Sequence, residues 1–268
     1  MSEILTFKTS RRKDAEQLLN KLLWLIIALL FLFLAADLLF HYIIVPKLRI
    51  RNIIVKSDIP ISRQEVLSIA EIDGKEDYFS LKGDVIRNNL EACLLVREAR
   101  VEKVFPDTLR LDLKGRKALF ISLADTGKGS FPVAIDEEGV IFQSGSSIKE
   151  WNLPLISGLK FNDLEPGAKL PKMLDSFLKE VTQMRAAYPD IFRLISEIQI
   201  VPLSPVSFEL LLYPLSFTVR VRLAGSIDGP VLKNALLVLD VLQREGISEK
   251  VKEIDFRTGE VVYRIKEG

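Results

Sequence analysis

Residues 97–114, REARVEKVFPDTLRLDLK, read as two β-strands joined by a turn. Leu109, Leu111 and Leu113 alternate with charged residues, which is the pattern of a strand with one buried face and one solvated face. Pro106 ends the preceding strand because its ring nitrogen has no hydrogen to donate to a sheet. We therefore predict strands over residues 97–105 and 109–113.

Two helices and another strand are predicted upstream of this pair. Ser62 and Glu65 have the spacing of a capping box, which favours a helix running to about residue 70. Apolar residues at helical spacing predict a second helix over 82–92, and the apolar residues of 48–55 predict a strand. The order strand, helix, helix, strand, strand makes a first domain over residues 46–115.

Residues 116–268 are predicted to form a mixed β-sheet with two helices, so the fold class is α+β. The helices are expected at about 171–187 and 231–244, and the second of them has a clear apolar stripe. Asp136, Glu137 and Glu138 precede Gly139 and predict a hairpin turn with solvated carboxylates. The strands are predicted over 118–123, 131–135, 140–142, 197–201, 206–213, 217–223, 251–256 and 260–266.

Leu22–Val45 is predicted to be a transmembrane helix. Twenty helical residues rise about 30 Å, the thickness of the hydrocarbon core, and the segment is uncharged from its start to Ala36. An uncleaved anchor is favoured over a signal peptide because Leu34-Ala35-Ala36 is a poor cleavage site. A short cytoplasmic tail, residues 1–21, and a long following part favour an N-in, C-out orientation.

Asp37 and His41 lie four residues apart and share a face of this helix. Two interpretations stay open: contact with another membrane helix, or an interfacial position near the lipid headgroups.

The composition argues against catalysis and against nucleic-acid binding. The net charge is +1, and the residues after the membrane segment carry equal numbers of acidic and basic side chains. His41 is the only histidine and Cys93 the only cysteine, so no Ser-His-Asp triad or His/Cys zinc site is expected outside the membrane. Cys93 itself is expected to be a buried structural thiol. We expect no enzyme activity, no catalytic residue, no cofactor and no metal.

The C-terminal strand, 260–266, is a candidate interaction site because an edge strand can accept a strand from a partner. Val261, Tyr263 and Ile265 would share one face. The plainer interpretation is an ordinary paired strand whose apolar face packs on the last helix.

Four short segments occur in the order of motifs in a known family: Val101–Leu111, Ala134–Phe142, Leu153–Gly158 and Ile254–Arg257. With one membrane segment in front of them, they resemble the FtsQ and DivIB proteins of bacterial cell division. The first segment is similar to a V-x-[RK]-x-x-P-x-T-L signature between the last two strands of a POTRA unit.

The chain departs from the family at two places. Gly115–Ala118 stand where the family usually has a glutamate and a proline, and Lys56–Asp58 replace a common Gly-Asn turn.

The resemblance implies a POTRA-like βααββ domain followed by a C-terminal β domain. It implies a non-enzymatic scaffold in the bacterial cytoplasmic (inner) membrane at the division septum, binding small bitopic coiled-coil proteins of the FtsB and FtsL (DivIC) type and other divisome proteins. Such a scaffold helps to recruit or regulate septal peptidoglycan synthesis. The alternative is another membrane-anchored POTRA-type binding or chaperone module of the envelope.

The resemblance also implies two sets of site residues. The family takes up a partner strand at its last strand, which here singles out Arg257, Thr258, Gly259, Glu260, Val261, Val262, Tyr263 and Arg264. Recruitment through the POTRA unit would involve Lys103, Phe105 and Pro106.

Overall fold

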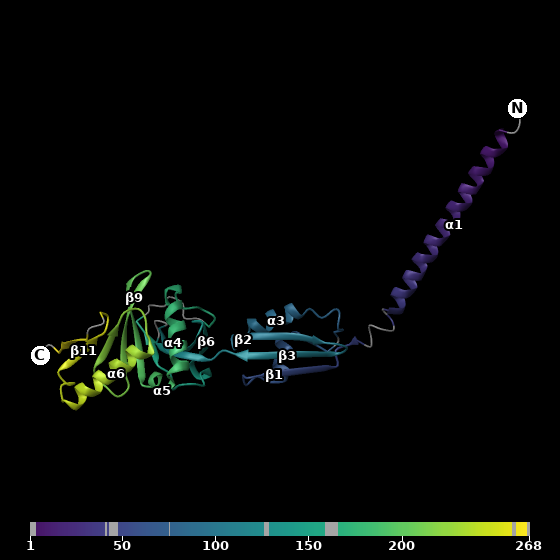
Figure 1. Cartoon of the computed structure of the whole chain (residues 1–268). Coiled ribbons are helices and arrows are strands. Elements are labelled where there is room, and N and C mark those ends of the chain that lie inside the picture. The colour runs from purple at the N-terminus through teal and green to yellow at the C-terminus, as the bar shows by residue number, and fades with distance from the viewer. Residues whose placement is uncertain are drawn as a thin grey trace. The chain divides into compact units, whose positions relative to one another are not determined.

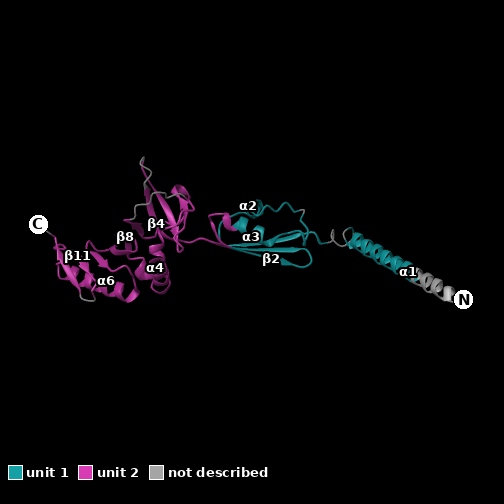
Figure 2. Cartoon of the chain, turned by 90° about the horizontal axis from the view of Figure 1, so that it is seen from above, with its two compact units in different colours: residues 1–90, 99–113 teal, residues 91–98, 114–268 magenta. Residues whose placement is uncertain are grey.

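The computed structural model describes residues 4–40, 42, 48–74, 76–125, 129–158, 166–258 and 261–266. The chain forms two compact units, coloured separately in Figure 2. The first comprises residues 1–90 and 99–113, and the second comprises residues 91–98 and 114–268. The domain boundaries predicted at residues 45 and 115 remain a prediction.

The chain begins with one long helix, α1, which spans Ile4–Leu39 (Figure 1). Its segment Leu18–Leu39 has 22 residues with none of its surface buried, and is long and apolar enough to cross a membrane. This apolar helix overlaps the predicted membrane helix over Leu22–Leu39. Asp37 is exposed on α1, whereas His41 and the last residues of the predicted span lie outside the described residues.

The first unit contains a three-stranded sheet in the order β1-β3-β2, with β1 parallel to β3. Leu109 and Leu111 of β3 are fully buried together with Val66 of α2 and Leu90 of α3, so the helices and the sheet share one core. The elements are β1 (Asn52–Ser57), α2 (Arg63–Ile69), α3 (Gly83–Ala92), β2 (Val96–Val104) and β3 (Thr108–Gly115). This is the predicted βααββ arrangement.

Two local features of this unit match the sequence. The capping box at the start of α2 is complete, because the Ser62 hydroxyl accepts from the Glu65 amide and the Glu65 carboxylate accepts from the Ser62 amide. Pro106 lies in the turn between β2 and β3, after a cis peptide bond.

The second unit is built on a nine-stranded mixed sheet in the order β12-β11-β10-β9-β8-β7-β4-β5-β6. The pairs β4–β7, β7–β8 and β10–β11 are parallel, and the others are antiparallel. The strands are β4 (Ala118–Asp125), β5 (Ser130–Asp136), β6 (Ile141–Ser144), β7 (Leu155–Ser157), β8 (Ile195–Ser204), β9 (Ser207–Pro214), β10 (Arg220–Leu223), β11 (Val251–Asp255) and β12 (Val262–Ile265).

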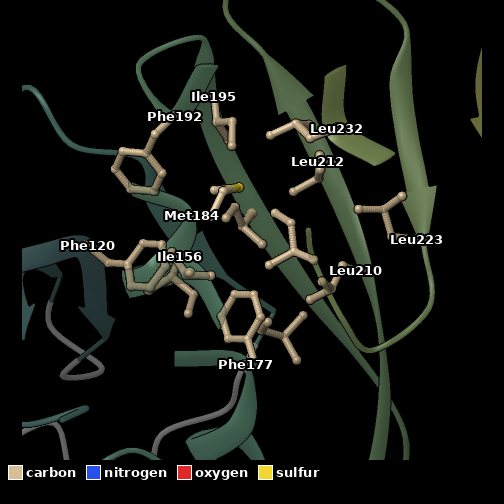
Figure 3. Close-up of a cluster of buried hydrophobic side chains, with 14 of the residues drawn as sticks. Phe120, Ile156, Phe177, Met184, Phe192, Ile195, Leu210, Leu212, Leu223 and Leu232 are labelled. Carbon is tan, nitrogen blue, oxygen red and sulfur yellow. The ribbon is translucent and has the colours of Figure 1, made fainter. Parts of the chain in front are cut away.

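The helices of this unit are α4 (Asp175–Ala187), α5 (Pro189–Phe192) and α6 (Gly229–Arg244), with short 3-10 turns at Gly145–Ser147 and Lys172–Leu174. Figure 3 shows the core where α4 meets the sheet. The ring of Phe177 on α4 stacks on Phe120 of β4 and meets Phe208 of β9 edge-on, with centroids 6.1 Å apart in both pairs. The helix therefore holds both halves of the sheet.

Two expectations about single residues were wrong. Asp136 is not solvated: its carboxylate is 1% exposed, accepts from the amides of Glu138 and Val140, and pairs with Arg116 at 2.5 Å. It organises the turn from inside because an aspartate can accept from backbone amides two to four residues ahead. Cys93 is half-buried and not buried.

Candidate functional site: the terminal strand and its charged face

The last strand, β12, lies at one end of the nine-stranded sheet. It pairs antiparallel with β11, with Tyr263 opposite Ile254 and Arg264 opposite Glu253. Within the part of the chain that the structure describes, no strand neighbours the other side of β12. The strand therefore has one satisfied edge and one edge open to a partner.

The backbone of β12 has a defined polarity. The amide of Lys266 donates to the carbonyl of Lys250 at 2.9 Å, so it points towards β11. Because amides alternate in direction along a strand, those of Tyr263 and Ile265 point to the open edge. These two residues present the hydrogen-bond donors that an added strand would use.

The side chains of β12 are exposed on both faces. Tyr263 is 58% exposed and Ile265 is 63% exposed, although their cross-strand partners Ile254 and Val251 are fully buried. Opposed residues of an antiparallel pair lie on the same face of the sheet. Tyr263 and Ile265 are therefore on the face that packs on the core, but the core does not extend far enough to cover them. The expected packing of this apolar face on the last helix is not observed.

The opposite face of the sheet carries a network of ion pairs next to β12. Glu253 of β11 is 1% exposed and accepts from Arg220 at 2.7 Å and from Arg222 at 2.6 Å. Arg222 also reaches Glu209 of β9 at 2.7 Å. Arg264 lies 3.9 Å from Glu253, which brings β12 to the edge of this network. We call these five residues the charged face.

The arginines lower the pKa values of the carboxylates that they contact. Burial alone would raise the pKa of Glu253, but hydrogen bonds from Arg222 and Arg220 outweigh it and hold the pKa below its ordinary value. The pKa of Glu209 is lowered in the same way, against burial, by Arg257 and Arg222. Glu253 and Glu209 therefore remain ionised at neutral pH.

The predicted site residues before β12 have a structural role. The guanidinium of Arg257 pairs with Asp255 at 2.6 Å and with Glu209 at 2.5 Å, which fixes the turn that follows β11. The hydrogen bond from Arg257 lowers the pKa of Asp255. Thr258 is exposed, and Gly259 and Glu260 lie outside the described residues. Sequence reasoning singled out Arg257 but missed its partners, because Glu209 is 48 positions away.

The residues predicted for recruitment through the first unit are Lys103, Phe105 and Pro106. The side chain of Lys103 is hydrogen-bonded, and the other two residues are exposed. The ammonium group of Lys103 donates to the carbonyls of Tyr78 at 2.9 Å and Leu81 at 3.1 Å, so it fixes a loop. Phe105 is 67% exposed, and Pro106 is also exposed. Only the last two are available to a partner.

Among the described residues, no group of three or more His, Cys, Asp or Glu side chains is arranged to hold a metal ion.

Comparison with known proteins gives one family model and several relatives. Residues 48–116 match the model "POTRA domain, FtsQ-type". The chain is 24% identical over 143 residues to cell division protein FtsQ of Bradyrhizobium diazoefficiens, covering 53% of this chain and 37% of that protein. It is 26% identical over 145 residues to cell division protein DivIB of Clostridium botulinum strain Hall, covering 54% of this chain and 55% of that protein.

A third relative is cell division protein DivIB of Clostridium tetani, which is 22% identical over 122 residues, covering 46% of this chain and 44% of that protein. The matched regions thus span about half or less of each relative's length.

Proposed function

We propose that the chain is a member of the FtsQ/DivIB family and a non-enzymatic, membrane-anchored scaffold of the division complex. The match of residues 48–116 to the FtsQ-type POTRA model and the similarity to FtsQ and DivIB proteins support this proposal. In this proposal it binds small bitopic division proteins of the FtsB and FtsL (DivIC) type and helps to recruit or regulate septal peptidoglycan synthesis. The helix α1 anchors it in the cytoplasmic membrane at the septum, with the tail cytoplasmic and the two folded domains that follow α1 outside.

The observation that carries the proposal is the open edge of β12. An added strand would pair with the outward amides of Tyr263 and Ile265, and each backbone hydrogen bond contributes about 0.5–1.5 kcal/mol net. Covering the exposed Tyr263 and Ile265 side chains would add about 1.5–3 kcal/mol each. These gains offset the cost of ordering a short partner segment.

The charged face supplies orientation to this contact. Arg264 is 57% exposed and lies at the rim of the network, while Glu253 inside it is already paired with two other arginines. A carboxylate on the partner would therefore find Arg264 available at the edge. Rim charges of this kind mainly direct association and select partners.

A bitopic partner suits a chain with one membrane helix. Two proteins that are both anchored in the same membrane meet at a high effective concentration, so a modest contact at β12 is sufficient. A second contact, for recruitment, is proposed at Phe105 and Pro106 of the first unit, with Lys103 positioning the neighbouring loop.

The alternative function is a membrane-anchored POTRA-type binding or chaperone module of the envelope. It would use the same open edge but would bind many extended polypeptides. Selectivity therefore discriminates the two functions: a scaffold binds the FtsB- and FtsL-type segments and not an unrelated extended peptide of equal length.

The test uses the full-length chain in lipid nanodiscs and the membrane-proximal segments of the FtsB- and FtsL-type proteins encoded by the same genome. Ile265→Pro removes an outward amide while leaving the ladder to β11 intact, since proline is tolerated on an edge strand. Tyr263→Lys with Ile265→Lys removes the apolar contact. The matched control is Val206→Lys, which changes an 84% exposed apolar residue at the β8–β9 turn.

Binding is expected to weaken about a hundredfold or more in the double lysine variant, because about 3 kcal/mol is lost. It is expected to weaken about two- to tenfold in Ile265→Pro, which loses one backbone hydrogen bond, and to stay unchanged in the control. A chain ending at Gly259 should not bind. If both β12 variants bind as tightly as the wild type, the edge-strand site is refuted. If the wild type itself does not bind at high micromolar concentration, the scaffold function is refuted.

A further inference from the structure

Three aromatic side chains form an exposed cluster on the first unit. The ring of Tyr78 meets both Phe79 and Phe105 edge-on, with centroids 5.7 Å apart in each pair. Phe79 is 58% exposed and Phe105 is 67% exposed. The ring of Phe79 also lies 6.2 Å from the ring of Phe40, just after α1. We call Tyr78, Phe79 and Phe105 the aromatic cluster. Phenylalanine rings gathered outside the core mark a contact surface.

The aromatic cluster is held on a fixed loop. Lys103 donates to the carbonyl of Tyr78 and lies 5.0 Å from the centroid of its ring. One carboxylate oxygen of Asp77 accepts from the amides of Phe79 and Ser80, each at 2.9 Å. The hydrogen bond with Ser80 is the main cause of the lowered pKa of Asp77. The loop is thus organised to present its rings outward.

The aromatic cluster lies at the end of the unit where the chain enters it from α1. The amide of Tyr78 donates to the carbonyl of Leu48 at 2.9 Å, and the amide of Arg51 donates to the carbonyl of Asp107 at 2.9 Å. The loop of Phe79 and the turn of Phe105 therefore flank the first residues of the unit. Six residue steps separate Leu48 from Tyr42, which allows about 20 Å of extended chain.

We propose that the aromatic cluster docks on the lipid bilayer, with Phe79 and Phe105 inserted at the level of the headgroups. A helix that crosses the membrane at Leu18–Leu39 keeps this end of the unit near the bilayer surface. Aromatic rings are favoured at that depth, where apolar bodies leave water. Arg49 and Arg51, both exposed beside the cluster, add attraction to anionic headgroups.

This contact would fix how the first unit stands on the membrane. It rests on α1 crossing the bilayer and not on the binding of any partner at β12. Failure of this membrane contact therefore leaves the proposed strand-edge site at β12 intact. Its success would exclude Phe105 from the proposed recruitment contact, because a ring inserted in the bilayer is not available to a protein partner.

A single tryptophan placed in the aromatic cluster tests the contact in the full-length chain. The background carries Trp24→Phe and Trp151→Phe, and Phe79→Trp supplies the only indole. Nanodiscs of phosphatidylcholine and phosphatidylglycerol are prepared with and without brominated acyl chains. The matched control is Val206→Trp in the same background, at the 84% exposed β8–β9 turn. Phe105→Trp is measured as a second reporter.

Emission from Phe79→Trp and Phe105→Trp is expected to shift to the blue and to be quenched by brominated lipid, while Val206→Trp emits as an exposed indole and is not quenched. Unshifted, unquenched emission from both reporters would overturn the proposal. A blue shift without lipid quenching would also overturn it, because the rings would then be covered by protein. The circular dichroism of each variant should match the wild type, since the changed side chains are exposed.

Discussion

Replacing Arg222 by methionine should destabilise the second unit by about 1.5–3 kcal/mol at neutral pH, because charge-assisted hydrogen bonds are lost in a largely buried network whose carboxylates each keep a second arginine. The Arg222 side chain is 16% exposed and joins two carboxylates, Glu253 at 2.6 Å and Glu209 at 2.7 Å. Methionine preserves most of the packing of the stem but leaves Glu253 with Arg220 and Glu209 with Arg257. The loss is therefore electrostatic and not a cavity effect.

Urea unfolding of the full-length chain in mild detergent, followed by circular dichroism, measures this loss. If the two units unfold in separate steps, only the step of the second unit should move to lower urea concentration in the variant. If they unfold together, hydrogen exchange separates them, and only the amides of the second unit should exchange faster in the variant. Arg193→Met is the control, because Arg193 is 69% exposed and its partner Asp190 is 93% exposed. That exposed pair should contribute less than about 0.5 kcal/mol.

The cost of Arg222→Met should depend on pH in a defined direction. The pKa values of Glu253 and Glu209 are lowered in the folded state, so their contribution is present above the unfolded pKa of about 4.3. It is lost as the pH falls through the lower folded values. Stability of wild type and variant should therefore converge in acid.

A loss below about 1 kcal/mol, or a loss of the same size at pH 7 and in acid, would refute this account, since a buried pair must cost more than an exposed one. Either result would mean that solvent already screens the charged face.

Three further predictions concern the fold. Gly158→Ala should cost at least about 2 kcal/mol in urea unfolding, because φ is +83° and the new Cβ would lie 2.0 Å from the Ile200 carbonyl oxygen. Gly74→Ala, at φ +80° in open space, should cost only about 1–2 kcal/mol of backbone strain; equal losses at the two glycines would disprove the steric argument. Ser62→Ala should remove the N-cap of α2 and cost about 1 kcal/mol, seen as faster amide exchange at the start of α2; unchanged exchange would exclude a stabilising cap. Phe177→Ala should cost about 3–5 kcal/mol in thermal or urea unfolding, and a loss near that of an exposed Phe79→Ala change would contradict its place in the core.

Much of the fold could be predicted from local pattern. The Leu109–Leu111–Leu113 alternation, the Ser62 capping box and the apolar stripe of α6 each produce the expected element, because one strong periodicity determines which face is buried. The strand β7 was not predicted. Three residues carry too little pattern, and β7 exists because β4 and β8 pair with it on either side.

The strand at the candidate site was predictable in position, but its surroundings were not. The alternation of Val261, Tyr263 and Ile265 indicated a strand, and its place as the last predicted strand made it the candidate edge. The pattern could not show that Tyr263 and Ile265 stay uncovered, because burial depends on where α6 ends and how far the core reaches. Nor could it find the charged face, whose members come from four separate strands. The aromatic cluster likewise joins residues about 26 positions apart.

The short strand β7 has a mechanical consequence. The sheet has two parts, β4–β6 and β8–β12, and they are joined only through the three residues of β7, Leu155–Ser157. A force applied between β12 and β4 would act first on β7, because only a few backbone hydrogen bonds connect it to β4 and β8. Helix α4 connects the two parts a second time, because Phe177 contacts Phe120 in the first part and Phe208 in the second. Tension across the second unit would thus be carried by side-chain packing on α4 as much as by the sheet itself.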